Sequence, residues 1–227
     1  MPTENNSVKK FKDREHAAEL LISKLNNEIK DEIAKDVVVF GIPRGGVILA
    51  YTIYKNRSAN YFDIVIPRKL GAPNNKELGI GAIMNKDIVY LNEYVVKALR
   101  VSQDYIETEK ESQIQEISRR SLLYRPKQNE YDIKNKTIIL VDDGAATGAT
   151  LVVSARWIRK MNPKRIIIAI PVAPKETVEL LKNEVDQVVT ILIPPTSNFT
   201  SVAQFYDNFE EITDDKVVKI MKEMNPK

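Results

Sequence analysis

Residues 138–150, with the sequence IILVDDGAATGAT, constrain the fold more than any other part of the chain. An apolar, β-branched run followed by small and hydroxyl-bearing residues is typical of a buried strand that opens onto a helix N-terminus. Free backbone N–H groups and the helix dipole make such a junction an anion site, and Thr147 and Thr150 add hydroxyl donors. Asp142 and Asp143 would repel a phosphate, so they must serve another part of the ligand, such as sugar hydroxyls or a metal ion. The segment therefore predicts a site for a phosphorylated sugar.

This order of residues resembles the motif with which type I phosphoribosyltransferases bind phosphoribosyl pyrophosphate (PRPP). The resemblance implies that Asp142 and Asp143 hold the ribose 2′- and 3′-hydroxyls. It also implies a loop around the 5′-phosphate, made of Gly144, Ala145, Ala146, Thr147, Gly148, Ala149 and Thr150. The alternative is that the two acids end a strand and cap the next helix, but a cap needs one acid and no Thr-Gly-x-Thr sequence.

Residues 37–54 repeat the order of strand, loop and helix, with the apolar run VVVF leading into GIPRGG. A second phosphate site is predicted there. The resemblance implies a pyrophosphate loop, in which Arg44 offers charge and Gly45 and Gly46 allow the backbone to approach the ligand. In several members of the family the peptide bond before the basic residue is cis, which would be Pro43–Arg44 here. An ordinary glycine-rich turn is the alternative for this segment alone.

Two cations follow the next predicted strand, DIVIP at residues 63–67. The carboxyl end of a parallel strand faces the ligand crevice in open α/β sheets, which would place Arg68 and Lys69 at that crevice. The resemblance to orotate and adenine phosphoribosyltransferases, which carry a similar pair, implies contacts to PRPP. A solvated pair of surface charges is the alternative.

A flexible loop is predicted at residues 70–82, which contain three glycines, one proline and few large apolar side chains. A hairpin should follow it, up to residue 91. In the family such a loop closes over PRPP and keeps water from the reacting carbon. Lys76 and Glu77 are therefore candidates for contacts made only when the loop is closed.

The order of predicted elements indicates an α/β fold with a doubly wound, mostly parallel sheet flanked by helices, which is the type I phosphoribosyltransferase fold. We expect one domain over residues 1–227. Within it we expect a core at about 37–193, a lid loop and hairpin at about 70–91, a helical insertion at about 93–125 and a C-terminal hood at about 194–212. Ser102 should cap the second helix of the insertion.

The hood segment is rich in aromatic residues, namely Phe199, Phe205, Tyr206 and Phe209. The favoured interpretation is that at least two of these rings belong to the core. The resemblance implies that the hood holds the acceptor base, on which Phe199 would stack. Three further arginines, Arg119, Arg120 and Arg125, end the helical insertion, where cations are favoured by the helix dipole alone; a phosphate contact is the less favoured alternative.

Composition excludes several kinds of site. The chain has no cysteine and one histidine, His16, to which we assign no role, so thiolate chemistry and multi-histidine metal sites are excluded. A net charge of +3 without a long basic run argues against nucleic-acid binding. No apolar run approaches the ~20 residues that span a bilayer. We therefore expect a soluble, cytoplasmic protein with no membrane partner.

The resemblance implies transfer of the 5-phosphoribosyl group from PRPP to a nitrogenous, nucleobase-like acceptor with release of pyrophosphate, as in nucleotide salvage. Arg44 and Lys69 would neutralise the leaving pyrophosphate. Mg²⁺ would bind through PRPP, with Asp142 and Asp143 as candidates for contact through water. By analogy with the family we also expect a homodimer.

The acceptor stays open at this stage. Ala146 stands where hypoxanthine-guanine enzymes carry an acid, as in adenine and uracil enzymes, yet residues 194–212 lack the glycine-rich pattern of the uracil enzymes. Overall the chain resembles the uncharacterised phosphoribosyltransferases predicted in bacteria and archaea. A PRPP-binding regulator without transferase activity is the alternative, and a nucleotide hydrolase is disfavoured because GAATGAT lacks a P-loop lysine.

Overall fold

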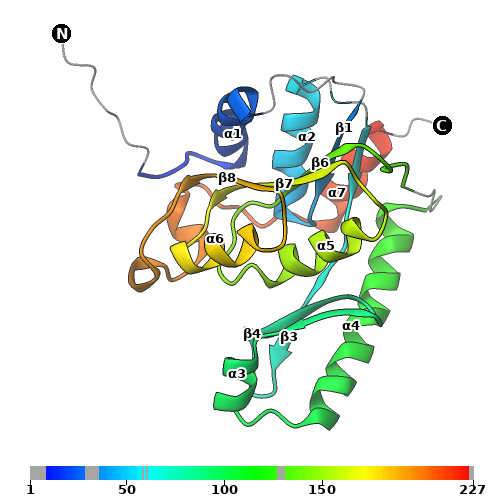
Figure 1. Cartoon of the computed structure of the whole chain (residues 1–227), viewed down its shortest axis with the longest axis vertical. Coiled ribbons are helices and arrows are strands. Elements are labelled where there is room, and N and C mark those ends of the chain that lie inside the picture. Colours follow the sequence, from blue (N-terminus) through cyan, green and yellow to red (C-terminus); the bar gives the residue numbers. More distant parts are fainter. Residues whose placement is uncertain (1–8, 29–35, 58, 60, 127–130, 225–227) are drawn as a thin grey trace.

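The centre of the fold is a parallel five-stranded sheet (Figure 1). The computed structural model describes residues 9–28, 36–57, 59, 61–126 and 131–224. Every neighbouring pair in the sheet is parallel, and β6 lies in the middle. The strand order is β2 (Tyr61–Ile64), β1 (Val37–Gly41), β6 (Thr137–Val141), β7 (Arg165–Val172) and β8 (Gln187–Leu192). Adjacent strands β1 and β6 are the ones that precede the two predicted phosphate loops.

Helices cover both faces of this sheet, and strand alternation divides the core between them. Val37, Val39 and Ile139 belong to one apolar cluster, whereas Val38 and Ile138 belong to another. Because successive strand residues point to opposite faces, both faces need apolar side chains, which explains the unbroken apolar runs in the sequence. The first cluster includes residues of α1 (Arg14–Glu28), α2 (Gly45–Arg57) and α7 (Asp214–Met224), and the second includes residues of α5 (Ala149–Arg159) and α6 (Lys175–Lys182).

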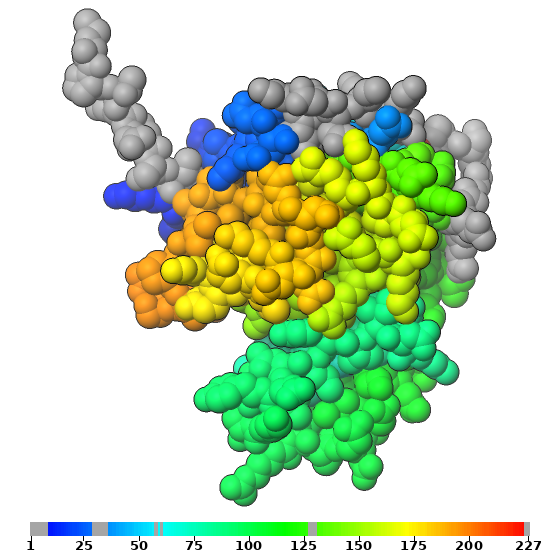
Figure 2. All heavy atoms as spheres, in the orientation of Figure 1, coloured from blue at the N-terminus to red at the C-terminus, as the bar shows by residue number. Residues whose placement is uncertain are grey.

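A smaller antiparallel sheet lies beside the main one, in the lower half of Figure 1. Its strands are β3 (Arg68–Ala72), β4 (Asn75–Asn85) and β5 (Ile88–Leu91). Helices α3 (Glu93–Ala98) and α4 (Gln103–Tyr124) follow it, and a third apolar cluster joins them to the strands. In the space-filling view these green and teal residues are continuous with the yellow-green of α5 (Figure 2). The contact is apolar, since Met84 and Ile88 share a cluster with α5.

The predicted loop at residues 70–82 is wrong, because most of these residues lie in β3 and β4. Two shifts in register, on either side of Gly71, let the glycine-rich strands pair. Leu70 and Ile80 are fully buried and supply the apolar face that this sheet needs. The hairpin expected up to residue 91 is confirmed as the antiparallel pair β4 and β5.

The other element predictions hold, with small differences at the ends. Ser102 caps α4, because its hydroxyl accepts a hydrogen bond from the Tyr105 backbone N–H at 3.3 Å. The hood segment contains the short 3-10 helices η2 (Thr196–Asn198) and η3 (Val202–Phe205). Tyr206 is buried and the rings of Phe199, Phe205 and Phe209 pack on the core, which confirms the favoured interpretation of the aromatic residues.

The chain before α1 is joined to the hood segment. Phe11 and Tyr206 form an isolated parallel bridge. The Phe11 N–H donates to the Phe205 carbonyl, and the Asp207 N–H donates to the Phe11 carbonyl, each at 2.8 Å. Residues almost two hundred positions apart are thereby brought to the same edge of the main sheet. Among the residues that the structure describes, none of the helices has the length and apolar character needed to cross a membrane.

Candidate functional site

The two predicted phosphate loops meet at the carboxyl edge of the main sheet, as expected from the adjacency of β1 and β6. The Ile42 N–H donates to the Val141 carbonyl at 2.9 Å, which ties the first loop to the second. Gly46 lies so close that a Cβ there would be 2.6 Å from the Val141 carbonyl oxygen. A Cβ on Gly45 would overlap the carboxylate of Asp143. These glycines are therefore required by the close approach of the two loops.

Hydrogen bonds to neighbouring elements hold the second loop, and its middle residues are exposed to solvent. The Ala145 N–H donates to the Val172 carbonyl at 2.9 Å, and the Thr177 hydroxyl donates to the Ala146 carbonyl at 2.6 Å. Ala146 and Thr147 are exposed. Gly144 and Gly148 have φ angles of 152° and 73°, which favour glycine, and no side chain caps the first turn of α5. The loop thus presents backbone N–H groups at a helix N-terminus, as an anion site requires.

The two acids differ in their partners. Asp143 accepts a hydrogen bond from Arg14 Nε at 2.9 Å, and its backbone carbonyl accepts one from the Tyr206 hydroxyl at 2.7 Å. Asp142 accepts a hydrogen bond from the Asp143 N–H at 2.9 Å. Burial raises the pKa of Asp142 well above its usual range, and the charge of Asp143 adds to the rise. Burial also raises the pKa of Asp143, against the opposing charge of Arg14. The acids therefore resist ionising together, and Arg14 compensates one of them.

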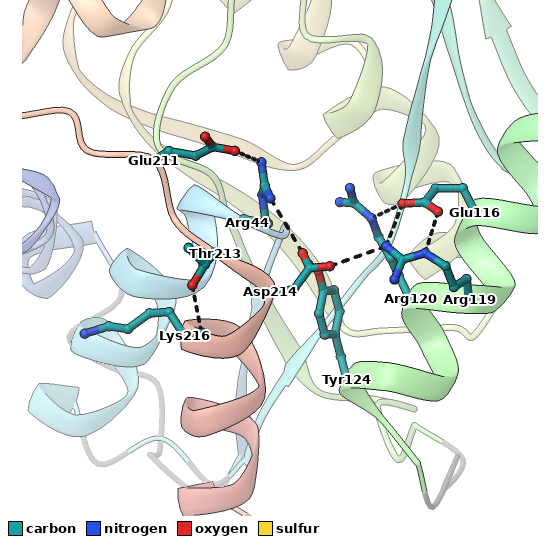
Figure 3. A network of polar contacts seen from close by, with 9 residues as sticks. All are labelled: Arg44, Glu116, Arg119, Arg120, Tyr124, Glu211, Thr213, Asp214 and Lys216. Carbon is teal, nitrogen blue, oxygen red and sulfur yellow. Dashed lines mark hydrogen bonds and ion pairs between the residues drawn. The ribbon is translucent and has the colours of Figure 1, made fainter.

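Arg44, in the first loop, is paired with carboxylates of the C-terminal segment (Figure 3). Its guanidinium contacts Glu211 at 2.5 Å and Asp214 at 3.7 Å. Asp214 also accepts a hydrogen bond from the Tyr124 hydroxyl at 2.6 Å and contacts Arg119 at 3.4 Å. The peptide bond between Pro43 and Arg44 is cis, which the sequence alone left open. A pyrophosphate at Arg44 would compete with these carboxylates for the guanidinium group.

The arginines at the end of α4 lie close to this network. Arg119 and Arg120 each donate to Glu116 at 2.7 Å, and Arg119 shares Asp214 with Arg44. Arg125 instead pairs with the buried Asp63 at 2.9 Å. The helix dipole is thus only part of their environment, since each of the three arginines has a carboxylate partner.

Glu116 gives the network a pH dependence. The hydrogen bond from Arg119 lowers the pKa of Glu116 from 4.5 to about 2; burial opposes this and a bond from Arg120 reinforces it. A carboxyl group whose pKa is lower in the folded than in the unfolded state stabilises the fold at pH values above its unfolded pKa. This stabilisation is lost as the pH falls from the unfolded pKa to the folded pKa of about 2. After allowance for solvent screening we expect about 1 kcal/mol, to be lost between pH 4.5 and about 2.

The test compares Glu116→Gln with the wild type by urea unfolding at pH 6 and pH 3, followed by the fluorescence of Trp157. The wild type should lose about 0.6 kcal/mol more than the variant between these pH values, because the rest of the contribution is lost only below pH 3. Glu93→Gln is the control, because the Glu93–Lys97 pair is almost fully exposed, at 81% and 78%. Equal losses in all three proteins would contradict the assigned role of Glu116.

The cations Arg68 and Lys69 have different surroundings, since Arg68 contacts α4 and Lys69 bonds within the hairpin. Arg68 Nε donates to Gln113 Oε1 at 2.9 Å, and burial lowers the pKa of Arg68, with the nearby charges of Arg120 and Arg44 adding to the effect. Arg68 is thus near the Arg44 network. Lys69 donates to the Glu77 carbonyl at 2.9 Å, within the hairpin.

Lys76 and Glu77 are not brought to the phosphate loops by their contacts. Lys76 donates to the Tyr105 hydroxyl at 2.7 Å and to the buried carboxylate of Glu109, both on α4. The Glu77 N–H donates to Asn75 Oδ1 at 3.1 Å, inside the hairpin. The contact of both residues with PRPP stays a prediction. The stacking of an acceptor base on Phe199 also stays a prediction; the centroid of its ring lies 5.3 Å from that of Phe205.

The comparison with known proteins identifies the family. The chain matches the family model described as the phosphoribosyl transferase domain over residues 5–210. The chain belongs to the phosphoribosyltransferase family. Two Mycobacterium tuberculosis proteins described as phosphoribosyl transferases, from strains CDC 1551 / Oshkosh and H37Rv, are each 32% identical over 214 residues. The match covers 94% of this chain and 47% of each relative, so the chain spans about half the length of these curated relatives.

Solved structures agree on the fold of this phosphoribosyltransferase. TT1426 from Thermus thermophilus has a TM-score of 0.74 at 33% identity, covering 95% of this chain and 99% of that one. The AQ2163 protein from Aquifex aeolicus has a TM-score of 0.50 at 14% identity, covering 80% of this chain and 75% of that one, which is a likeness of fold alone. The predicted type I phosphoribosyltransferase fold is confirmed.

Phosphoribosyltransferases generally use Mg²⁺ together with PRPP. Such an ion would need oxygen ligands from the protein, from PRPP or from water. Among the residues that the structure describes, no group of three or more His, Cys, Asp or Glu side chains is suited to holding a metal ion. Asp142 and Asp143 offer two carboxylates, one of them bonded to Arg14. Mg²⁺ prefers six oxygen ligands, so the carboxylates suit it only if phosphate oxygens and water complete the shell.

Sequence reasoning missed three members of this site: Arg14, Glu211 and Asp214. Arg14 is 129 positions from Asp143, and Glu211 is 167 positions from Arg44. All three lie in ordinary charged stretches of helix starts or connections, with no motif around them. The packing of α1 and α7 on the core and the bridge between Phe11 and Tyr206 bring them to the loops.

Proposed function

We propose that this phosphoribosyltransferase transfers the 5-phosphoribosyl group from PRPP to a nitrogenous, nucleobase-like acceptor and releases pyrophosphate. The observation that carries the proposal is the contact between the two loops, in which Gly45 and Gly46 lie against Asp143 and Asp142. A ligand with a ribose between two phosphate-bearing ends would use both loops at once. The acids would bind the ribose hydroxyls, and residues 144–150 would bind the 5′-phosphate.

The reaction breaks the bond between ribose C1 and the pyrophosphate oxygen, which leaves with the electron pair. A bond then forms between C1 and the acceptor nitrogen, which releases a proton to water. Positive charge develops on the ribose, so the ring must be held in place and protected from water. Asp142 and Asp143 would orient the ring, and Arg44 would exchange Glu211 and Asp214 for pyrophosphate oxygens. Bound Mg²⁺ supplies further charge neutralisation at the pyrophosphate.

The assignment of Lys69, Lys76 and Glu77 to the closed state depends on movement of the β3–β4 hairpin. Lys69 would add charge near the leaving group, and the hairpin would exclude water. Their present contacts with the hairpin itself and with α4 must then be exchanged for contacts with PRPP. The acceptor, the homodimer and the cytoplasmic location also stay predictions.

A PRPP-binding regulator is the second candidate, and one observation favours it. The hairpin is fastened to α4 by the buried carboxylate of Glu109, which bonds the Gly71 N–H, Gln113 and Lys76. A hairpin held in this way would leave the PRPP loops open, which suits sensing of PRPP better than water-sensitive chemistry.

Pyrophosphate release separates the two candidates. The protein is incubated with PRPP, Mg²⁺ and a panel of purine and pyrimidine bases, with Asp143→Asn as the inactive control. A transferase should release pyrophosphate with at least one acceptor and form the corresponding nucleotide, which mass spectrometry detects. Tight PRPP binding without release for every acceptor would contradict the transferase and support the regulator.

A further inference from the structure

We propose that Arg14, which lies outside both phosphate loops, is the positioning residue that sets Asp143 for binding the ribose of PRPP. The inference rests on the proposed function, since it assigns Asp143 to the ribose. Arg14 is in the first turn of α1, a helix that the family resemblance did not connect with the ligand. Its role follows from the contacts of its guanidinium group.

The guanidinium of Arg14 is fixed on three sides. Nε donates to Asp143 Oδ2 at 2.9 Å, and Nη1 donates to the Glu210 carbonyl at 2.8 Å. The ring of Phe209 lies beneath it, with 3.8 Å between Cζ and the ring centroid. The side chains of Arg14 and Asp143 are only 8% and 14% exposed. Such a pair loses little to solvent screening, and each partner depends strongly on the other.

The surroundings of Arg14 also hold the backbone of Asp143. Tyr206, which donates its hydroxyl hydrogen to the Asp143 carbonyl, forms the bridge with Phe11 just before α1. Asp143 is thereby held at its carbonyl by Tyr206 and at its carboxylate by Arg14. Both supports come from the paired N-terminal and hood segments, so one unit outside the parallel sheet sets the orientation of this acid.

Arg14 also lies against the pyrophosphate loop. A Cβ on Gly45 would be 3.0 Å from Arg14 Nε, so the ion pair fills the space beneath that glycine. Hydrogen bonds from ribose hydroxyls to a carboxylate are strong only if the carboxylate is oriented and its charge is supported. Arg14 supplies both conditions without a place in either loop motif.

The test measures three affinities by calorimetry: for PRPP with Mg²⁺, for ribose 5-phosphate, and for pyrophosphate with Mg²⁺. Arg14→Gln should weaken binding of the two ribose ligands about tenfold and leave pyrophosphate binding within about twofold of the wild type. Arg14→Lys keeps the charge and should recover part of the ribose affinity. Phe209→Leu removes the supporting ring and should give a smaller loss of the same kind.

Arg125→Gln is the matched control. Arg125 also pairs with a buried aspartate, Asp63, and also stacks on an aromatic ring, with 3.9 Å between its Cζ and the centroid of Tyr131. Its loss should lower the melting temperature without changing the ratio of ribose to pyrophosphate affinity. In the Asp143→Asn background, Arg14→Gln should add little further loss, because Arg14 acts through Asp143.

The outcomes distinguish this inference from the proposed function. If the wild type binds neither ribose ligand, the proposed function fails and the role of Arg14 fails with it. If the wild type binds both ligands but Arg14→Gln weakens pyrophosphate as much as ribose 5-phosphate, only the positioning role is overturned. Full additivity with Asp143→Asn would overturn it as well.

Discussion

Asp143→Asn should remove about half or more of the thermal stabilisation that PRPP and Mg²⁺ give to the wild type. A ligand at one hundred times its Kd stabilises the native state by about 2.7 kcal/mol, which for a chain of this size raises the melting temperature by roughly 5–10 °C. In the variant an amide replaces the carboxylate of Asp143, which lies against Gly45 of the first loop and against Arg14. The loss of charge-assisted bonds to the ribose would weaken binding by one to two powers of ten.

Differential scanning fluorimetry with increasing PRPP checks this expectation. Asp132→Asn is the control, because Asp132 is 85% exposed and pairs only with Lys136 among the ion pairs described. The control should keep the full shift. A full shift in Asp143→Asn would remove Asp143 from the ribose site. No shift in the wild type at any PRPP concentration would end both the transferase and the regulator proposals.

Gly45→Ala should weaken PRPP binding at least as strongly as Asp143→Asn, by about tenfold or more. The new methyl group would overlap the Asp143 carboxylate and approach Arg14 Nε to 3.0 Å. Either the pyrophosphate loop or the ion pair must move, and in both cases the two loops lose their shared geometry. The change should thus affect binding of both the pyrophosphate and the ribose of the ligand, unlike Arg14→Gln.

The control for this change is another added methyl group. A Cβ on Gly79 would lie 3.2 Å from Lys69 Cδ, which is part of a flexible side chain and is able to give way. Calorimetry with PRPP and with pyrophosphate should show a loss for both ligands in Gly45→Ala and little change in Gly79→Ala. If Gly45→Ala binds both ligands as the wild type does, the contact between the loops is not needed for binding.

The main sheet was predictable from sequence because its strands are buried on both faces. Runs such as Val37–Gly41 and Thr137–Val141 have no polar alternation, and each leads directly into a loop of small residues. Residue type alone therefore identified both the strands and the sheet edge at which the candidate site lies. The order of helices and strands then left few topologies to consider.

The pairing of β3 with β4 in the small sheet was missed because it depends on tertiary contacts. Gly71, Gly79 and Gly81 weaken local strand propensity, and two register shifts obscure the alternation of buried residues. Pairing is supported by an apolar cluster in which Leu70 and Ile80 join Ile106 of α4. Sequence windows of a few residues do not contain that partner.

The site was predictable only where a loop carries its own residues. Asp142, Asp143, Arg44 and the glycines lie in two short motifs, but their counter-charges come from distant segments. Arg14, Glu211 and Asp214 are charged residues among many others in a chain that is 29% charged. Which charged residues reach the site depends on contacts in three dimensions, and no spacing in the sequence identifies them.

The small sheet has an apolar cluster of its own with α3 and α4, while Met84 and Ile88 at its other end join the main-sheet cluster that contains α5. Units with their own core tend to unfold as separate cooperative blocks. The ribose and phosphate loops, by contrast, extend from β1 and β6, and β6 is paired on both sides. Local unfolding confined to the end of the hairpin around Leu70 and Ile80 would therefore leave the proposed PRPP loops folded, and under the proposed function capture of the sugar phosphate and protection from water would be separable in time and in free energy.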